Sequence, residues 1–228
     1  MPYYARKHQL KNSLLYHIVN RGNARATVFH TDKDYRHFFG LLKEYSCKFA
    51  MKVYHWVLMP NHYHLLIELP EPEEISACMA GINRSYTCYY HRTYRTAGFL
   101  WQGRFKLQPI QKETHLIACA RYIERNPVKA GIVIEAAAYP YSSAKFYCQR
   151  RSDGLTAEDS GYSEFGNNAV GRMQAYSRYL HEINDEEGKW FANLEEPLGD
   201  KEFINRLIKI NGRYMPKRRG SPKKTIVT

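Results

Sequence analysis

Two strand-like runs separated only by Pro60-Asn61 constrain the fold of this chain more than any other feature. Residues 51–59 (MKVYHWVLM) and 62–69 (HYHLLIEL) are rich in β-branched and aromatic residues, which favour strands. The Pro-Asn pair between them is a turn signal. The sequence therefore predicts two strands joined by a tight turn.

The segments around this pair alternate between helix and strand patterns. The helix predicted at 32–49 begins with an acidic residue, and the helix predicted at 113–131 should end before Pro127. In chain order the elements are a strand at 14–22, a helix at 32–49, strands at 51–59 and 62–69, a helix at 71–95, a strand at 104–111 and a helix at 113–131. This order, β-α-β-β-α-β and then a helix, predicts an α+β fold: a ferredoxin-like split βαβ antiparallel sheet with helices on one face.

The charge of the 228-residue chain is segregated along its length. Residues 1–150 carry a net charge of +11 and are expected to form one domain. Residues 151–210, with a net charge of −5, are expected to be an acidic linker and helical extension with short helices at 169–183 and 200–210. Residues 211–228 carry +6 and are expected to be a flexible basic tail. Such segregation favours a polyanionic partner, because each neutralised phosphate releases counterions. A basic surface that only maintains solubility is the alternative.

The cysteines and the apolar runs indicate a cytoplasmic protein that does not enter a membrane. The number of cysteines is odd and no C-x-x-C pair occurs, which argues against a disulfide framework and a thiolate zinc site. The N-terminal residues lack the apolar segment of a signal peptide, and no apolar run approaches the length of a membrane span. The five cysteines are Cys47, Cys78, Cys88, Cys119 and Cys148.

The His-Tyr-His sequence at the start of the second strand is a candidate metal site. Side chains alternate along a strand, so His62 and His64 share one face while Tyr63 points to the other. Two imidazoles at this spacing can bind one cation and leave coordination sites free for a substrate oxygen and water, as a catalytic metal requires. Two surface histidines are the alternative interpretation of a motif this short.

A second candidate feature lies in the last predicted helix of this domain. Tyr122 and Asn126 are four residues apart and share a helix face, while Leu116, Ala120 and Ile123 form another face that can pack on the sheet. A tyrosine hydroxyl can attack phosphorus if a metal polarises the phosphate, and its ordinary pKa near 10 means that it needs help to ionise. The alternative is a helix-end tyrosine followed by an asparagine near the cap.

Four segments together resemble the single-tyrosine HUH transposase family, where HUH means His-hydrophobic-His. They are WVLMPNHYHLLIELP, LWQGRFK, ARYIERNPVKAGIV and YPYSSAKFY. The similarity is greatest to the branch of tyrosine transposases associated with repetitive extragenic palindromes (REP). It covers roughly residues 10–150, with the segments in order.

The resemblance implies a metal-dependent endonuclease and strand transferase that acts on single-stranded, hairpin-bearing DNA. It implies that His62 and His64 bind Mg²⁺ or Mn²⁺, that Asn126 is the third ligand, and that Tyr122 attacks the scissile phosphate. The product is a 5′-phosphotyrosine link and a free 3′-OH. Some relatives have Gln where this chain has the shorter Asn126. Residues 1–150 would then be the catalytic domain.

Basic residues outside this constellation are candidate DNA contacts. On the 71–95 helix, tyrosines alternate with arginines, a mixture that single-strand binders use for stacking and phosphate contact. Aromatic packing with a solvated face is the equally favoured alternative for Tyr86, Tyr89, Tyr90 and Tyr94. Trp101 is expected to belong to the core. The candidate DNA-binding residues are Arg84, Arg92, Arg95, Arg104, Lys106, Lys217, Arg218 and Arg219.

Two other functions remain open at this stage. One is a domesticated relative that binds folded DNA or RNA without cutting it. The other is an HUH replication initiator, which the palindrome-family segments and the lack of a helicase domain disfavour. The family includes monomers and homodimers, and both assemblies remain open for this chain.

Overall fold

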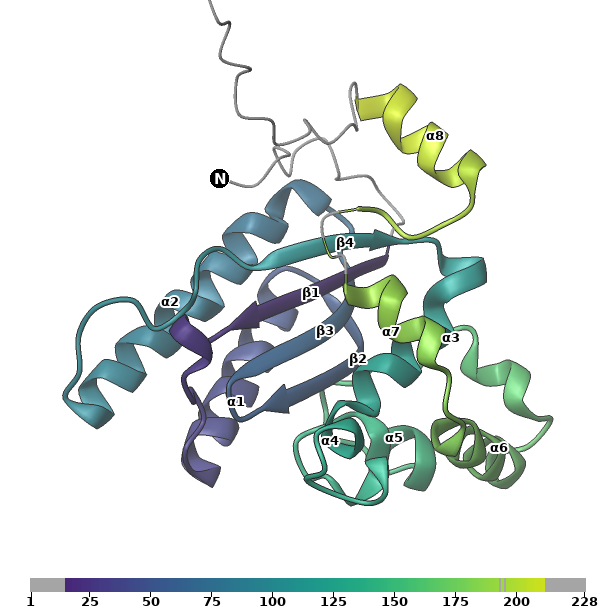
Figure 1. Cartoon of the computed structure of the whole chain (residues 1–228), viewed down its shortest axis with the longest axis horizontal. Helices are drawn as coiled ribbons and strands as arrows, with labels where there is room; N and C mark the ends of the chain where they lie inside the picture. The colour runs from purple at the N-terminus through teal and green to yellow at the C-terminus, as the bar shows by residue number, and fades with distance from the viewer. Residues whose placement is uncertain (1–14, 193, 195, 212–228) are drawn as a thin grey trace, which may run out of the picture.

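The computed structural model describes residues 15–211 apart from 193 and 195, and at its centre is a four-stranded antiparallel sheet (Figure 1). The strands lie in the order β2-β3-β1-β4. They are β1 (Leu15–Arg21), β2 (Lys52–Met59), β3 (His62–Glu68) and β4 (Lys106–Ile110). The predicted α+β fold with an antiparallel sheet is confirmed.

The helices follow the predicted chain order through the sheet domain. They are α1 (Asp32–Lys48), α2 (Ile75–Tyr94), α3 (Lys112–Glu124), α4 (Asn126–Lys129), α5 (Ala144–Gln149), α6 (Ala169–His181), α7 (Asp185–Ala192) and α8 (Lys201–Asn211), with short 3₁₀ turns η2 (Asn23–Arg25), η3 (Pro72–Glu74), η4 (Ala136–Ala138) and η5 (Tyr162–Phe165). As predicted, α3 ends before Pro127. The sequence patterns did not predict α5 and α7.

One face of the sheet is covered by α1 and α2. A capping box between Thr31 and Asp34 starts α1, and the helix then buries Phe38 and Leu42 against the sheet. Alternate strand residues such as Ile18 face this core. In Figure 1, α1 and α2 lie behind the sheet.

The expectation that helices cover only one face of the sheet is wrong. On the second face, α3 packs Leu116 and Ile123 against Val57 of β2 and Leu66 of β3, and Phe191 of α7 joins the same core. The strands carry apolar residues on both faces of the sheet, so the second face must also be buried by packed helices. The face that carries His62 and His64 is therefore partly enclosed by α3 and α7.

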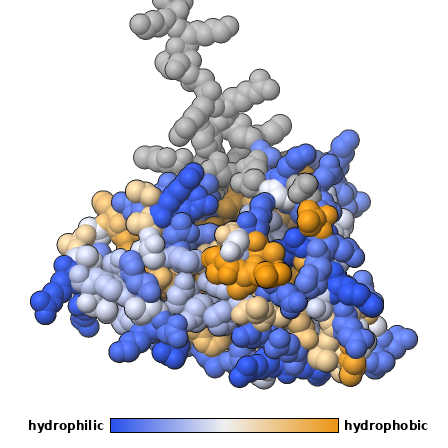
Figure 2. Space-filling model, turned by 60° about the horizontal axis from the view of Figure 1, so that its bottom comes forward, coloured by the Kyte–Doolittle hydropathy of each residue, from blue (hydrophilic) through white to orange (hydrophobic). Residues whose placement is uncertain are grey.

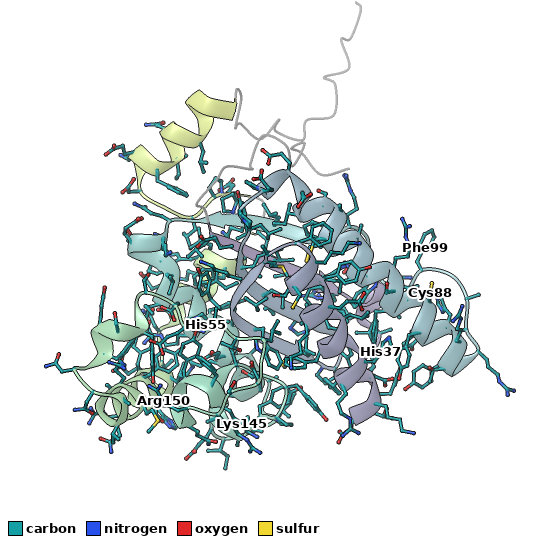
Figure 3. The ribbon with its side chains drawn as sticks, turned by 180° about the vertical axis from the view of Figure 1, so that it is seen from behind. His37, His55, Cys88, Phe99, Lys145 and Arg150 are labelled. Atoms are coloured by element: carbon teal, nitrogen blue, oxygen red, sulfur yellow. The ribbon has the colours of Figure 1, made fainter. Side chains whose placement is uncertain are left out.

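A β-bulge and a buried ion cluster fix the position of α3. The register of β2 against β3 shifts between Val53 and His55, and the fully buried His55 faces α3. Figure 3 labels His55. Its Nδ1 lies 2.8 Å from Oε1 of Glu124, the last residue of α3, and its Nε2 lies 3.0 Å from Oδ2 of Asp159. The cluster therefore joins β2, α3 and the segment that precedes η5.

The imidazole and the carboxylates of the cluster stabilise each other's charged forms. Burial lowers the pKa of His55, but the charge of Glu124 and the hydrogen bonds to Asp159 and Glu124 outweigh it and raise this pKa to about 9. Burial raises the pKa of Asp159, but the hydrogen bond and charge of His55 outweigh it and lower this pKa. Tyr176 of α6 adds a 2.9 Å hydrogen bond to Glu124.

The segment predicted to be a loop or linker is packed against the edge of the sheet. Ala157 N donates to Val53 O at 2.9 Å, and Trp56 Nε1 donates to Thr156 Oγ1 at 3.0 Å. The predicted helices at 169–183 and 200–210 correspond to α6 and α8. The division of the chain at residue 150 stays a prediction, and the basic tail lies outside the described residues.

The surface is mostly hydrophilic on the face shown in Figure 2, with separate apolar patches. Within the described ranges, no helix is long and apolar enough to cross a membrane.

We expect the ion cluster to make stability depend on alkaline pH. Because the folded pKa of His55, about 9, lies above its ordinary value of 6.5, the stabilisation is complete below pH 6.5 and is lost as the pH rises through 9. The loss should be on the order of 3 kcal/mol. The free energies of unfolding of the wild type and of His55→Gln, measured with urea, should therefore differ less and less as the pH rises from about 6 to about 10. A difference that stays constant over this range would contradict the charged cluster.

Candidate functional site

Three histidines cluster on the face of the sheet that α3 covers. His62 and His64 of β3 have ring centroids 5.1 Å apart, and His17 of β1 stacks on His64 at 5.1 Å with an angle of 18° between the rings. In the strand register Val19 is opposite His64, so His17 is its diagonal neighbour. His17 lies outside the motifs noted in the sequence, although strand alternation places it with Val19 and Arg21 on one face of β1.

Tyr122 of α3 faces this cluster. Its ring centroid lies 5.6 Å from that of His64 and 5.9 Å from that of His17, with the rings nearly perpendicular. As expected, Leu116 and Ile123 of the same helix pack on the sheet. The structure thus brings the predicted tyrosine to the predicted histidines.

Asn61 orients the ring of His62. Its amide nitrogen donates to the carbonyl oxygen of Arg25 at 3.2 Å, which directs Oδ1 to Nδ1 of His62 at 2.5 Å. Because Oδ1 can only accept, Nδ1 of His62 carries the proton. The lone pair of a neutral His62 is then on Nε2, where it is available to a cation.

Asn126 is close enough to act together with His62 despite its short side chain. Its Nδ2 donates to the carbonyl oxygens of Tyr122 at 2.8 Å and of Ile123 at 3.3 Å. This leaves Oδ1 beside the imidazole of His62, where it favours the protonated ring and partly opposes the effects of burial and Arg21 on its pKa. The amide oxygen and the imidazole are therefore close enough to bind one ion.

Burial keeps the imidazoles neutral. It lowers the pKa of His17 to about 4, and burial together with the positive charge of Arg21 lowers that of His62 to about 4. Burial also places the pKa of His64 well below the ordinary value. Metals bind the neutral form of histidine. Burial raises the pKa of Tyr122, an effect that Arg21 opposes, so the phenol needs a cation to ionise.

The residues present fit a divalent cation held by two imidazoles and one amide oxygen. Between residues 15 and 211, leaving out 193 and 195, no group of three or more His, Cys, Asp and Glu side chains is arranged to hold a metal ion. The candidate donors here are instead His62, His64 and the oxygen of Asn126. Such a mixed nitrogen and oxygen set suits Mn²⁺ better than Mg²⁺, which prefers oxygen alone.

Two of the predicted DNA contacts lie at the same end of the sheet as His62. Lys106 of β4 is opposite Val19, which in turn is opposite His64, and Arg21 is opposite His62. Lys106 and Arg104 are both exposed. These cations form a positive rim beside the histidines.

The other predicted basic contacts are not beside the histidines. Arg84 and Arg92 lie on α2, which covers the opposite face of the sheet, and Arg95 is exposed at the end of that helix. Lys217, Arg218 and Arg219 lie outside the described residues.

Most of the tyrosines on α2 are structural. Tyr86 is fully buried and donates to Val28 O at 2.6 Å, so a stacking surface that includes it is ruled out. Tyr89 and Tyr94 donate to the carboxylate of Asp34 at 2.9 and 2.6 Å. The packing alternative therefore describes these three residues. Trp101 packs against the same core, as expected.

Helix α7 covers part of the site. Phe191 lies 4.9 Å from Tyr122 and 5.8 Å from His17 between ring centroids. Glu187 accepts a hydrogen bond from Nε of Arg121 at 3.0 Å, which fastens α7 to α3. No motif in the sequence signalled this contact.

Comparison with known proteins identifies the family. The sequence profile described as "Transposase IS200 like" matches residues 10–126, more than half of the chain. The chain therefore belongs to the IS200-like transposase family, and the family expected from the sequence motifs is confirmed.

Two matched proteins carry a narrower description than the family profile. Over 97 residues the chain is 34% identical to a protein of Haemophilus influenzae named as a REP-associated tyrosine transposase, in a match that covers 38% of this chain and 54% of that protein. The chain thus spans about half the length of this curated relative. A solved structure of a REP-associated tyrosine transposase bound to a REP hairpin matches with a TM-score of 0.52 and 22% identity, covering 70% of this chain and 93% of that one. At this identity the structural match shows the fold alone.

We expect Phe191 to hold α7 over Tyr122 in solution. Phe191 is 1% exposed and its neighbour Trp190 is 37% exposed. Phe191→Ala should lower the free energy of unfolding by about 3 kcal/mol, as typical for a buried Phe, and should speed hydrogen exchange of α7 amides measured by mass spectrometry. Trp190→Ala is the matched control and should cost clearly less. Equal effects of the two variants would show that α7 is not packed on Tyr122.

Proposed function

We propose that this protein is a metal-dependent single-stranded DNA endonuclease and strand transferase that acts on hairpin DNA. The observation that carries the proposal is the meeting of Tyr122 with His64, His62 and Asn126 on one face of the sheet. A phenol beside a mixed nitrogen and oxygen donor set is an arrangement suited to phosphoryl transfer.

The proposed reaction conserves the number of phosphoester bonds. The Tyr122 oxygen forms a bond to phosphorus as the bond to the 3′-oxygen of the leaving strand breaks, giving a 5′-phosphotyrosine and a free 3′-OH. Attack by a 3′-OH of another strand reverses the step and joins the two strands. When bound, Mg²⁺ or Mn²⁺ supplies the Lewis acid that polarises the phosphate.

The residues of this chain prepare Tyr122 for attack. Burial raises its pKa and favours the neutral phenol, while the positive charge of Arg21 favours the phenolate. The neutral state of His62 and His64 keeps their nitrogen lone pairs available. Phe191 packs against the tyrosine ring and restricts its rotation.

The names of the relatives support REP-type hairpin DNA as the substrate. One relative is named as a REP-associated transposase, and the matched structure is described as bound to a REP hairpin. The rim of Arg21, Arg104 and Lys106 supplies positive charge beside the histidines for a phosphate backbone. We place the catalytic residues in the proposed 1–150 domain and the protein in the cytoplasm, where such DNA is met.

One observation favours a second candidate function, a binder of folded nucleic acid that does not cut. Phe191 packs on Tyr122 and restricts access to it. If this contact persists with DNA bound, the chain would bind hairpins without forming a covalent link.

Removing the hydroxyl oxygen of Tyr122 tests whether this residue is the nucleophile. Tyr122→Phe keeps the ring that packs on Phe191, so its thermal stability and hairpin binding should equal those of the wild type. Incubation of labelled single-stranded hairpin DNA with Mn²⁺, followed by a denaturing gel, should show a covalent adduct for the wild type and none for Tyr122→Phe.

The matched control is Tyr90→Phe on α2, which should retain the adduct because α2 covers the opposite face of the sheet. His64→Ala should bind the hairpin but form no adduct. Adduct formation by Tyr122→Phe would place the nucleophile elsewhere. Hairpin binding by the wild type without an adduct would favour the non-cleaving binder.

We expect the basic tail to contribute long-range attraction to DNA. Residues 212–228 contain six Lys and Arg residues and no acidic residue. Their deletion should weaken hairpin binding and flatten the plot of log affinity against log salt by roughly 0.7–0.9 for each phosphate that the tail neutralises. Fluorescence anisotropy at several salt concentrations measures this slope. An unchanged slope would mean that the tail does not touch DNA.

A further inference from the structure

We infer that His17 is a positioning residue that fixes the ring orientation and the tautomer of His64, so that Nε2 of His64 is available to the cation. The inference rests on the proposed function, because it assigns a partner to one of the proposed metal ligands. His17 belongs to none of the motifs that suggested the site.

The contact between the two rings is direct and shielded from water. Nε2 of His17 lies 2.9 Å from Nδ1 of His64, and the rings stack at 5.1 Å. His17 is fully buried and His64 nearly so. Because water cannot replace this hydrogen bond, the orientation of His64 depends on His17.

The surroundings of His17 indicate which ring donates the proton. Gln108 is directly opposite His17 on β4, and its side chain favours the protonated form of His17, as an oxygen turned toward the imidazole does. The amide nitrogen of Gln108 donates to Trp190 O at 3.2 Å, which leaves its oxygen for His17. A neutral His17 with its proton on Nδ1 has its lone pair on Nε2. That lone pair accepts from Nδ1 of His64, and Nε2 of His64 is then unprotonated.

The same arrangement occurs at His62. There Oδ1 of Asn61 accepts from Nδ1, at 2.5 Å, and leaves Nε2 of His62 as the donor atom for a metal. Each of the two proposed ligands thus has its own acceptor behind Nδ1, an amide oxygen for His62 and an imidazole for His64. Metal-binding histidines in general use their second nitrogen in this way.

The decisive measurement is Mn²⁺ affinity without DNA, by electron paramagnetic resonance of the free ion, on the full chain. His17→Phe keeps a ring of similar size and removes the acceptor, so its dissociation constant should rise about 10- to 100-fold. His17→Gln places an amide oxygen near the position of Nε2 and should restore affinity to within about threefold of the wild type, since one acceptor replaces another. Thermal unfolding and hairpin binding serve as controls for folding.

A second measurement needs no variant and remains decisive if His17→Phe does not fold. Long-range ¹H–¹⁵N spectra of the metal-free wild type distinguish the two neutral tautomers of each histidine. We expect the proton of His64 on Nδ1. A proton on Nε2 of His64 would overturn the inference, because the ring would then turn its protonated nitrogen toward the cation.

The outcomes separate this inference from the proposed function. If the wild type binds no Mn²⁺ even with hairpin DNA present, the metal-dependent function fails and the inference falls with it. If the wild type binds Mn²⁺ and a folded His17→Phe binds it equally well, only the role of His17 is overturned. Weaker binding by His17→Phe with recovery in His17→Gln supports the inference.

Discussion

Glu124 is buried at the end of α3 and accepts hydrogen bonds from His55, Ser143 and Tyr176, so four separate segments meet at one carboxylate. Burying charges is costly unless they are paired, and the second carboxylate of the cluster, Asp159, completes the pairing of His55. Tyr122 and Asn126 stand two residues before and two residues after Glu124. The ion cluster therefore holds the proposed nucleophile and the proposed amide ligand at a fixed height over the sheet.

The enclosure of the second face then sets the electrostatics of the site. An imidazole on an open sheet face would titrate near neutral pH, whereas burial under α3 and α7 lowers the pKa of each of the three histidines. The same burial makes Tyr122 harder to ionise. The site thus consists of neutral nitrogen donors and a neutral phenol, with Arg21 as the nearby fixed charge. These are the donors that the proposed divalent cation would meet.

The segments beyond residue 150 pack against this site and contribute contacts to it. Asp159 pairs with His55, Glu187 pairs with Arg121, and Phe191 contacts Tyr122 and His17. The match to the family profile ends at residue 126. These later contacts restrict access to Tyr122, the proposed nucleophile.

The sequence by itself determined the order of the four strands and of α1, α2 and α3, the shared face of His62 and His64, and the helix that carries Tyr122, because strand alternation and helical spacing are local properties. It could not determine that α3 turns onto the second face, that His17 of β1 is diagonal to His64, or that Phe191 reaches Tyr122. Those facts depend on strand order, on the bulge in β2 and on contacts between residues far apart in the chain. Only the tertiary structure decided them, since a buried charge such as Glu124 finds its partners through the packing of the whole chain and not through spacing along it.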